Sequence, residues 1–328
     1  MREVALFAVL CGFGVVSGFN DGGNLIASFT SGRVISPHAA AWLLLLVPLG
    51  PLVAGTRVAQ TIGTNVIDLG AQGATGFALI ALVSMTVALA SWRWRIPISM
   101  TIALIGAMLG WVLAVPGASG IRWQGVAKSL VGTPLSVIAG LGCAFLLHRA
   151  ARRALGRLPF ARALRIARMQ YFTSALQAVA YGSNDMEKTI GLVAAAEIVL
   201  HRSSSSGIGR HAPLLLASGS FLGGAFVGGW RVARRVSSGI FRVRPVEALT
   251  EQLSAGLVVV AFAAAGAPVS STQATGGSLV GVGISVGASG VRWSAVRQLC
   301  ASWLVTFPLA FGLALVLHLV LRVSLGIR

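Results

Sequence analysis

The sequence predicts an all-α, polytopic membrane protein, built as an inverted-topology repeat of about 5+5 transmembrane segments with broken helices. Of its 328 residues, 55% are hydrophobic and 10% are charged, whereas a soluble domain carries about a quarter charged residues. Apolar runs long enough to cross a bilayer as a helix recur along the whole chain. Short motifs recur in the same order in both halves, which indicates a duplicated unit.

Ten apolar segments are candidate transmembrane helices, because crossing the bilayer core takes about 20 apolar residues. The first and the sixth segment are expected to break near 18–24 and 182–188, where glycines and charged side chains interrupt them. The links at 92–96 and 266–268 are short enough to be either loops or the tips of re-entrant hairpins, which leaves the count open between eight and twelve. The segments are about 4–30, 38–56, 74–91, 96–114, 124–148, 169–200, 212–230, 246–266, 267–286 and 295–321.

Four short motifs of the first half recur in the second half. They pair 18–24 with 182–188, 55–59 with 229–233, 97–101 with 268–272, and 119–123 with 289–293. One match can arise by chance, but four collinear matches indicate duplication. Each half carries five segments, so the second half is expected to enter the membrane upside down. Inverted repeats with broken helices are typical of secondary transporters, whose site lies at the repeat interface near the midplane.

The basic residues predict the domain boundaries and the orientation. We expect an N-terminal repeat over 1–148, a basic cytoplasmic linker over 149–168 and a C-terminal repeat over 169–328. The positive-inside rule makes the linker cytoplasmic, and alternation through ten segments then puts both termini outside. The seven arginines of the linker are Arg149, Arg152, Arg153, Arg157, Arg162, Arg165 and Arg168.

Composition and spacing argue against several other classes of protein. The net charge of +18 suggests nucleic acid as a partner, but the basic residues lie between apolar segments and serve better as topology markers. The three cysteines, Cys11, Cys143 and Cys300, are far apart in apolar runs, so we expect buried free thiols rather than disulfides or a metal site. Neither a catalytic Ser/His/Asp set nor a metal cluster is visible, so the sequence does not predict an enzyme.

An Asn-Asp pair stands inside an apolar segment in each half. A carboxylate in the bilayer core costs at least about 3 kcal/mol, so such residues are usually functional. Their side-chain oxygens, with carbonyls freed at Gly22 and Gly23, suit a hard cation such as Na⁺. A structural polar pair between helices and a proton carrier are the alternatives. The candidate cation ligands are Asn20, Asp21, Asn24, Asn184 and Asp185.

A proline followed by hydroxyl residues also occurs once in each half, at 97–101 and 268–272. Proline favours the first turn of a helix, and the N–H groups of a helix N-terminus attract anions. Two such ends related by a pseudo-two-fold axis would hold a tetrahedral oxyanion from both sides. Ordinary helix capping is the alternative. The candidate anion ligands are Ser99, Thr101, Ser270, Ser271 and Thr272.

Lys188 makes the two Asn-Asp motifs unequal, because it stands where the first half has Asn24. On a helix it follows Asp185 by three residues, so the two side chains can pair. It is a candidate ligand for the oxyanion, or a fixed charge that replaces one cation. The alternative is a lysine that snorkels to the membrane interface.

These motifs resemble the PiT family of inorganic phosphate transporters over nearly the whole chain. Residues 184–191 resemble the bacterial Asn-Asp-x-x-Lys form of the family signature, and 97–101 and 268–272 resemble its Pro-Val-Ser-Thr-Thr-His-like stretches. The resemblance implies a plasma-membrane symporter that moves phosphate with Na⁺ or H⁺ by alternating access. It implies phosphate at the serine-bearing helix ends, cations near the Asn-Asp motifs, and no cofactor besides the transported cation.

Several residues depart from the family pattern. Met100 replaces a hydroxyl residue, and Ile102 and Gln273 stand where the family often has histidine. Fewer titratable groups suit a dianion that needs no proton acceptor, so a sulfate or thiosulfate permease of the same fold is the alternative. An anion channel is less favoured. The expected partners are phosphate or sulfate and the lipid bilayer, with a homodimer left open and no nucleic acid.

Overall fold

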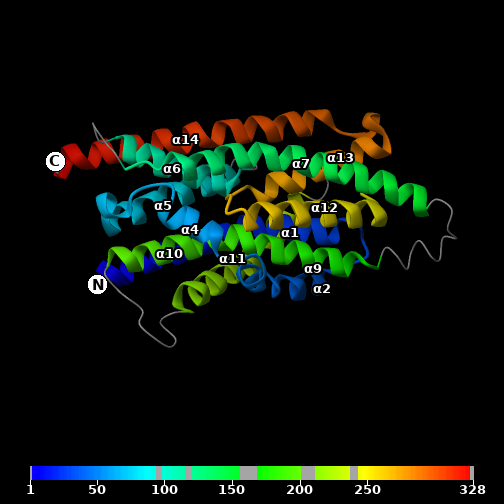
Figure 1. The fold of residues 1–328 in the computed structure, drawn as a ribbon, viewed down its shortest axis with the longest axis horizontal. Coiled ribbons are helices and arrows are strands. Elements are labelled where there is room, and N and C mark those ends of the chain that lie inside the picture. The colour runs from blue at the N-terminus through cyan, green and yellow to red at the C-terminus, as the bar shows by residue number, and fades with distance from the viewer. Residues whose placement is uncertain are drawn as a thin grey trace.

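The computed structural model describes residues 2–93, 98–114, 120–155, 168–200, 211–236 and 243–325. These residues form helices and turns, with no β-strand beyond an isolated bridge between Ile67 and Ile121. The prediction of an all-α protein is therefore confirmed. Each of the ten predicted segments corresponds to one helix or to a short series of helices (Figure 1).

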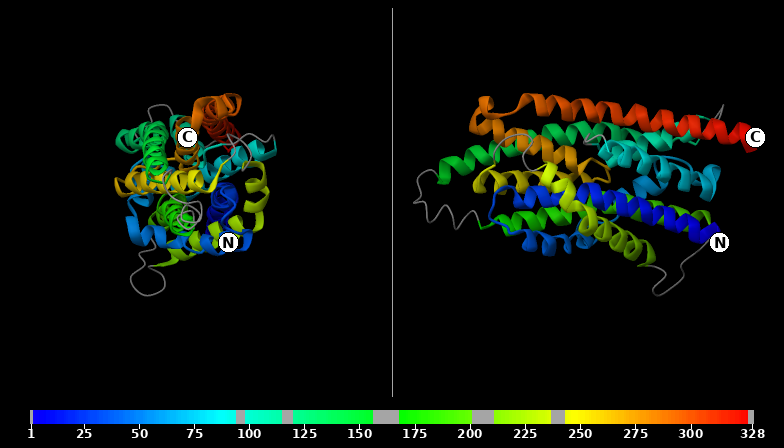
Figure 2. Two further views of the ribbon diagram at one scale, coloured as in Figure 1. Left: turned by 90° about the vertical axis from the view of Figure 1, so that its right-hand side faces the viewer. Right: turned by 180° about the vertical axis from the view of Figure 1, so that it is seen from behind.

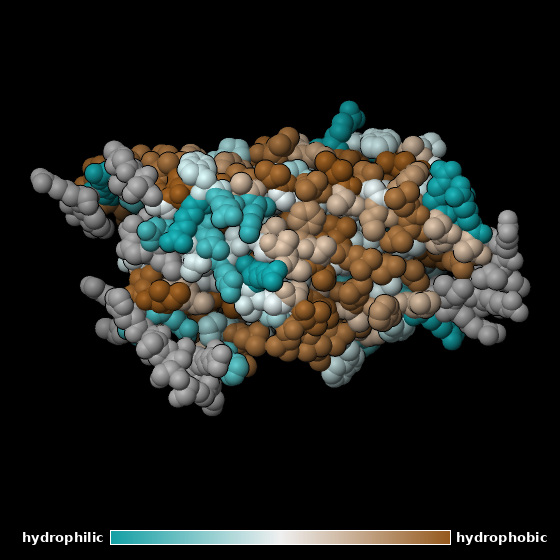
Figure 3. Space-filling model, viewed as in Figure 1, coloured by the Kyte–Doolittle hydropathy of each residue, from teal (hydrophilic) through white to brown (hydrophobic). Residues whose placement is uncertain are grey.

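The elements in chain order are α1 (Arg2–Ser31), α2 (Pro37–Leu44), η1 (Val47–Leu49), α3 (Gly50–Ala54), α4 (Arg57–Thr64), α5 (Leu69–Arg93), α6 (Met100–Leu113), α7 (Trp123–Leu155), α9 (Gln170–Tyr181), η2 (Gly182–Met186), α10 (Glu187–Val199), α11 (Ala212–Val236), α12 (Pro245–Ala264), α13 (Ser271–Gly287), η4 (Ala288–Gly290) and α14 (Trp293–Leu325). Seven stretches of the described chain are long and apolar enough to cross a membrane. Large apolar side chains such as Val227 and Leu304 are exposed, and much of the face in Figure 3 is apolar. A surface of this kind is expected where lipid surrounds the protein.

Helices α5 and α6 form a hairpin that enters and leaves at the same end of the molecule. The backbone N–H of Asp68 donates to Gly120 O at 2.7 Å, and that of Arg122 donates to Val66 O at 2.9 Å. These bonds join the start of α5 to the segment that follows α6. Helix α6 has 14 residues and rises about 21 Å, less than the bilayer core of about 30 Å. This length favours a re-entrant hairpin over a pair of spanning segments here, and the number of spanning segments stays a prediction.

Helices α12 and α13 form a second hairpin, which enters from the opposite end (Figures 1 and 2). At the C-terminal end of α7, His148 Nδ1 lies 3.0 Å from Thr250 Oγ1 near the start of α12, and Arg152 Nη1 donates to Ser285 O of α13 at 2.9 Å. The turn between the two helices is buried, with Val269 fully inaccessible. Non-helical backbone is tolerated at membrane depth where protein surrounds it, so this burial favours the re-entrant alternative for 266–268.

The two termini lie at one end of the molecule, and the helix ends that flank 156–167 lie at the other end (Figure 1). This agrees with the predicted placement of the termini opposite the basic linker. The first residues of the predicted linker are helical, because α7 continues to Leu155. Residues 156–167 lie outside the described residues.

The halves are interleaved rather than packed as two bodies. Helix α1 packs along α11, α6 along α14, and α13 along α7. The last two pairings are reciprocal, because each joins the second helix of one half's hairpin to the last long helix of the other half. A site between the halves is therefore lined by helices from both.

The glycines of the first Asn-Asp motif do not break their helix. Helix α1 runs without interruption from Arg2 to Ser31, so the predicted break at 18–24 is wrong. A Cβ at Gly18 would collide with Phe221 O, and one at Gly22 would collide with Ala225. These glycines let α1 and α11 approach closely, as small residues do between membrane helices. The carbonyls expected to be freed at Gly22 and Gly23 stay within the helix.

The second motif does interrupt its segment. Gly182–Met186 form a single turn of π-helix, η2, between α9 and α10. A π-turn locally changes the hydrogen-bond pattern of a helix and is frequent at functional sites. The second predicted break is therefore present, as a π-turn rather than as an unwound segment.

Candidate ion and anion site

The first Asn-Asp motif forms a compact hydrogen-bond network on α1. Ser17 Oγ donates to Asp21 Oδ2 at 3.0 Å, and Asn20 Nδ2 donates to Asp21 Oδ1 at 2.8 Å. The carboxylate is buried, and both donors come from the same face of the helix. Asp21 is thus held by neutral donors, and none of the described side chains forms an ion pair with it.

The second motif is held by an ion pair. Lys188 Nζ lies 2.5 Å from Asp185 Oδ1, and the Lys188 side chain is completely buried. The Asp185 side chain is also buried. The expected pairing of the two residues is confirmed. The alternative in which Lys188 snorkels to the interface is wrong, because its ammonium stays inside the protein.

The tip of the second hairpin joins the two motifs. Asn24 Nδ2 donates to Thr272 Oγ1 at 2.9 Å, and Thr272 Oγ1 donates to Asp21 Oδ1 at 3.4 Å. On the other side, Asn184 Nδ2 donates to Ala267 O at 3.4 Å. Residues that are far apart in the sequence therefore meet at Ala267–Thr272.

The two serine motifs have the same local geometry. Ser99 is the N-cap of α6 and Ser270 is the N-cap of α13, with φ/ψ of −104°/115° and −92°/107°. Each hydroxyl oxygen accepts from a backbone N–H three residues later, at 3.3 Å, from Ile102 N and Gln273 N respectively. Capping is therefore present at both positions. Pro97 lies outside the described residues.

The two hairpin tips contact each other through Thr101. Thr101 Oγ1, in the first turn of α6, donates to Val269 O at 2.8 Å. Both helix N-termini consequently lie close together in the interior of the molecule. Four of the predicted residues form one hydrogen-bonded network, and two more, Asn184 and Thr101, bond to backbone carbonyls of the same tip. The four are Asn20, Asp21, Asn24 and Thr272.

Several buried polar atoms around this tip lack a hydrogen-bond partner in the described part of the chain. They include Asn184 Oδ1, Asp185 Oδ2 and Ser271 Oγ. An unsatisfied buried polar atom costs about 1–3 kcal/mol, so native proteins rarely leave such atoms together without a ligand. Amide, carboxylate and hydroxyl oxygens are ligands that hard cations accept. The oxygens of Asn184 and Asp185 are therefore candidate ligands for a cation, whereas the Ser271 hydroxyl can also donate to an anion.

The carboxylates of the two motifs share one electrostatic environment. The charge on Asp21 interacts with those on Asp185 and Lys188, and Tyr181 is close enough to interact with both carboxylates. When both carboxylates are ionised, the two motifs carry two negative charges and one positive charge, so the site has a net negative charge. This arrangement attracts a cation and repels an anion until the cation is bound.

Glu187 is a residue of the site whose role the sequence left undefined. Its side chain is fully buried, and Oε2 accepts from Ala59 N at 3.0 Å, in the first turn of α4. Helix α4 in turn contacts the second hairpin, because Thr61 Oγ1 donates to Gly266 O at 2.7 Å. Arg57 Nη1 also donates to Ala264 O at 2.6 Å. Glu187 thus caps the short helix that holds the hairpin tip.

Glu251 also lies in the interior of the protein. Ser28 Oγ donates to Glu251 Oε2 at 2.8 Å, and Gln177 Nε2 lies 3.5 Å from Glu251 Oε1. Glu247 instead accepts from Arg244 N at 2.6 Å, at the start of α12. The two glutamates of α12 therefore have different partners: Glu251 contacts α1 and α9, whereas Glu247 caps its own helix.

Two hairpins enter from opposite ends of the molecule and meet beside two buried carboxylates, one from each motif. This arrangement is typical of a membrane transport protein. The model of the phosphate transporter family matches residues 17–314, so the chain belongs to that family. The resemblance inferred from the motifs is thus confirmed. As its relatives are transporters, the protein is not an enzyme.

Relatives match almost end to end. A "probable low-affinity inorganic phosphate transporter" of Rhizobium meliloti is 30% identical and covers 94% of this chain and 92% of its own. A protein of Bacillus subtilis with the same description is 26% identical and covers 97% of each chain. A solved structure described as "the sodium-dependent phosphate transporter" superimposes with a TM-score of 0.82, at 20% identity, over 98% of this chain and 99% of its own. At this level of identity, the similarity to the solved structure shows that the two proteins share a fold.

Proposed function

We propose that this protein transports inorganic phosphate together with Na⁺ or H⁺ by alternating access. The observation that carries the proposal is the convergence of both Asn-Asp motifs and both serine-capped helix ends on one buried tip. Membership of the phosphate transporter family supports phosphate as the substrate. The structural neighbour is described as sodium-dependent, which favours Na⁺ as the coupling ion.

The cation is held by Asn20, Asp21, Asn24, Asn184 and Asp185. Support comes from the unpartnered oxygens of Asn184 and Asp185 and from the excess negative charge of the site. A bound cation neutralises this charge, so phosphate binds more tightly once the cation is present. By linkage, phosphate then tightens cation binding by the same factor.

Phosphate is held at the N-termini of α6 and α13. The side chains proposed as its ligands are Ser99, Thr101, Ser270, Ser271, Thr272 and Lys188. The helix dipoles and free N–H groups of the first turns favour an anion there. Thr272 already bonds to Asn24 and Asp21, so the proposed anion and cation ligands lie one hydrogen bond apart.

Alternating access is proposed to arise from the two hairpins, which enter from opposite ends and touch at Thr101 and Val269. Movement of one tip away from the other would open the site to one side only. The reciprocal packing of α6 on α14 and α13 on α7 supports an inverted repeat. We propose that the end carrying Arg149 to Arg153 faces the cytoplasm.

Uptake of labelled phosphate into proteoliposomes tests the function. We expect accumulation against the phosphate gradient when either a Na⁺ or an H⁺ gradient is imposed inward, and none in empty vesicles. The same vesicles with excess sulfate test the substrate, and we expect sulfate neither to compete nor to be taken up. Flux that never runs against the phosphate gradient under either cation gradient would contradict coupled transport.

A further inference from the structure

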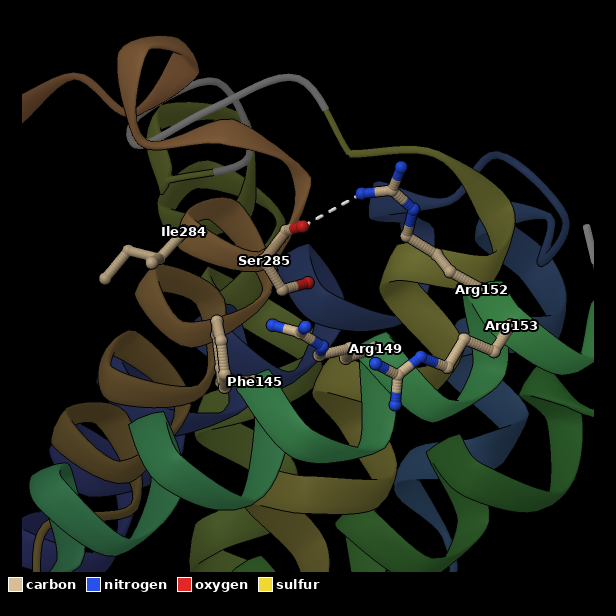
Figure 4. Close-up of a pocket in the computed structure, with 6 residues that line it drawn as sticks. All are labelled: Phe145, Arg149, Arg152, Arg153, Ile284 and Ser285. Carbon is tan, nitrogen blue, oxygen red and sulfur yellow. Dashed lines mark hydrogen bonds between the residues drawn. The ribbon is translucent and has the colours of Figure 1, made fainter.

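A basic hollow lies at the C-terminal end of α7, away from the site described above. Its volume is about 400 Å³. Figure 4 shows α7 and α13 contributing its walls. The residues that line it are Phe145, Arg149, Arg152, Arg153, Ile284 and Ser285, and we call it the arginine pocket.

The positive charge of the arginine pocket is not neutralised by the protein. Among the described residues, no carboxylate lies within ion-pair distance of the three guanidinium groups. Glu247 interacts with Arg152 only through their charges at longer range. Three cations around one hollow give it a positive potential, which favours an anion there.

The polar groups of the arginine pocket also point to a ligand. Arg152 is fixed by its hydrogen bond to Ser285 O, drawn in Figure 4, and so forms part of the wall. The hydroxyl oxygen of Ser285 is buried and has no partner among the described residues. Arg149 and Arg153 are exposed and keep their guanidinium donors for a ligand. Guanidinium groups bind phosphate oxygens in a bidentate manner.

The apolar part of the pocket selects among phosphate-bearing ligands. Phe145 and Ile284 line it beside the arginines, and Leu146 and Ile138 of α7 are exposed further along the same helix. A free phosphate ion makes no use of such a surface, whereas the acyl chains of a phospholipid do. Basic pockets between membrane helices on the cytoplasmic side are suited to anionic head groups.

We propose that the arginine pocket binds the phosphate group of an anionic phospholipid, with its acyl chains along α7. The pocket joins two helices that are already tightly packed, because a Cβ at Gly277 or Gly281 of α13 would collide with α7 carbonyls. Helix α13 begins at Ser271 and Thr272, so a bound lipid stabilises the position of the helix that carries them. This second step rests on the proposed function, but lipid binding itself does not.

Lipid retention by the purified full-length protein tests the proposal. We compare R149Q/R153Q with a matched control, R292Q/R297Q, which removes two exposed arginines beyond the end of α13. Arg152 is kept because it bonds to Ser285. Native mass spectrometry would measure binding of phosphatidylglycerol and of phosphatidylcholine.

We expect R149Q/R153Q to bind phosphatidylglycerol about tenfold more weakly than wild type, as lost charge-assisted hydrogen bonds predict. The control and the binding of phosphatidylcholine should be unchanged. Equally weakened binding of phosphatidylglycerol by both variants would overturn the proposal, because a general loss of surface charge would then explain the weaker binding. A third arm adds inorganic phosphate alone. The lipid assignment would be overturned if inorganic phosphate raised the thermal stability of wild type but not of R149Q/R153Q, while lipid had no effect on either protein. None of these readouts requires transport.

Discussion

The two Asn-Asp motifs have similar sequences but hold their carboxylates in different ways. Asp21 lies on an unbroken helix and is held by the neutral donors Ser17 and Asn20. Asp185 lies on a π-turn and is paired with Lys188. The first half therefore presents an unneutralised carboxylate, whereas the second supplies its own cation. We infer that the two halves contribute unequally to cation binding.

The largest effect should follow from removing the unneutralised carboxylate. We expect Asp21→Asn to reduce coupled phosphate uptake about hundredfold, because a buried cation loses its charged ligand. The substitution keeps the size of the side chain, so the protein should remain folded. Uptake into proteoliposomes is the measurement, with Asp68→Asn as a control outside the site. Near-normal coupled uptake would remove Asp21 from the cation site.

A second substitution makes the two motifs alike. Lys188→Asn gives the second half the residue of the first and leaves Asp185 uncompensated. Breaking a buried ion pair in this way should destabilise the protein by about 3–5 kcal/mol. Uptake should also become more steeply dependent on the cation concentration, because an additional cation must replace the ammonium. Thermal unfolding measures the loss of stability, and uptake at varied cation concentrations measures the second effect. An unchanged cation dependence would refute the hypothesis that the Lys188 ammonium takes the place of one cation.

Glu187 is a further difference between the halves, since the first half has Gly23 at the matching position. We expect Glu187→Gln to lower stability by about 1 kcal/mol, because an amide oxygen can still accept from Ala59 N but lacks the charge that favours a helix N-terminus. Glu187→Ala should lower it by about 2 kcal/mol, since the cap is lost entirely. Thermal unfolding distinguishes them. A Glu187→Gln variant as stable as wild type would mean that the charge contributes nothing to capping α4.

Substitution of the two capping serines should have the smallest effect on stability and uptake. Ser99→Ala and Ser270→Ala each remove one N-cap and should each cost about 1 kcal/mol of stability. If the hydroxyls also bind phosphate, both variants will raise the KM for phosphate. Stability and uptake kinetics are measured on the same preparations. A loss confined to stability would limit these two serines to capping.

Much of the candidate site was predictable from the sequence because its chemistry is local. Charged and amide side chains in apolar segments stand out wherever the chain takes them, and the pairing of Asp185 with Lys188 follows from helical spacing alone. The capping role of Ser99 and Ser270 also follows from residue type and position. The functions of Gly18 and Glu187 were not predictable, because their partners Phe221 and Ala59 are distant in sequence.

The sequence by itself determined that this is a helical membrane protein with a repeated pair of polar motifs, because hydrophobic length and motif order are properties of the chain. Only the tertiary structure decided which segments cross and which turn back, because a short apolar helix can do either until its neighbours bury its ends. The tertiary structure also decided how the two motifs differ. The π-turn at Gly182–Met186 and the close approach of α1 to α11 depend on contacts between the halves. Because of those contacts, two similar sequences hold their carboxylates in different surroundings.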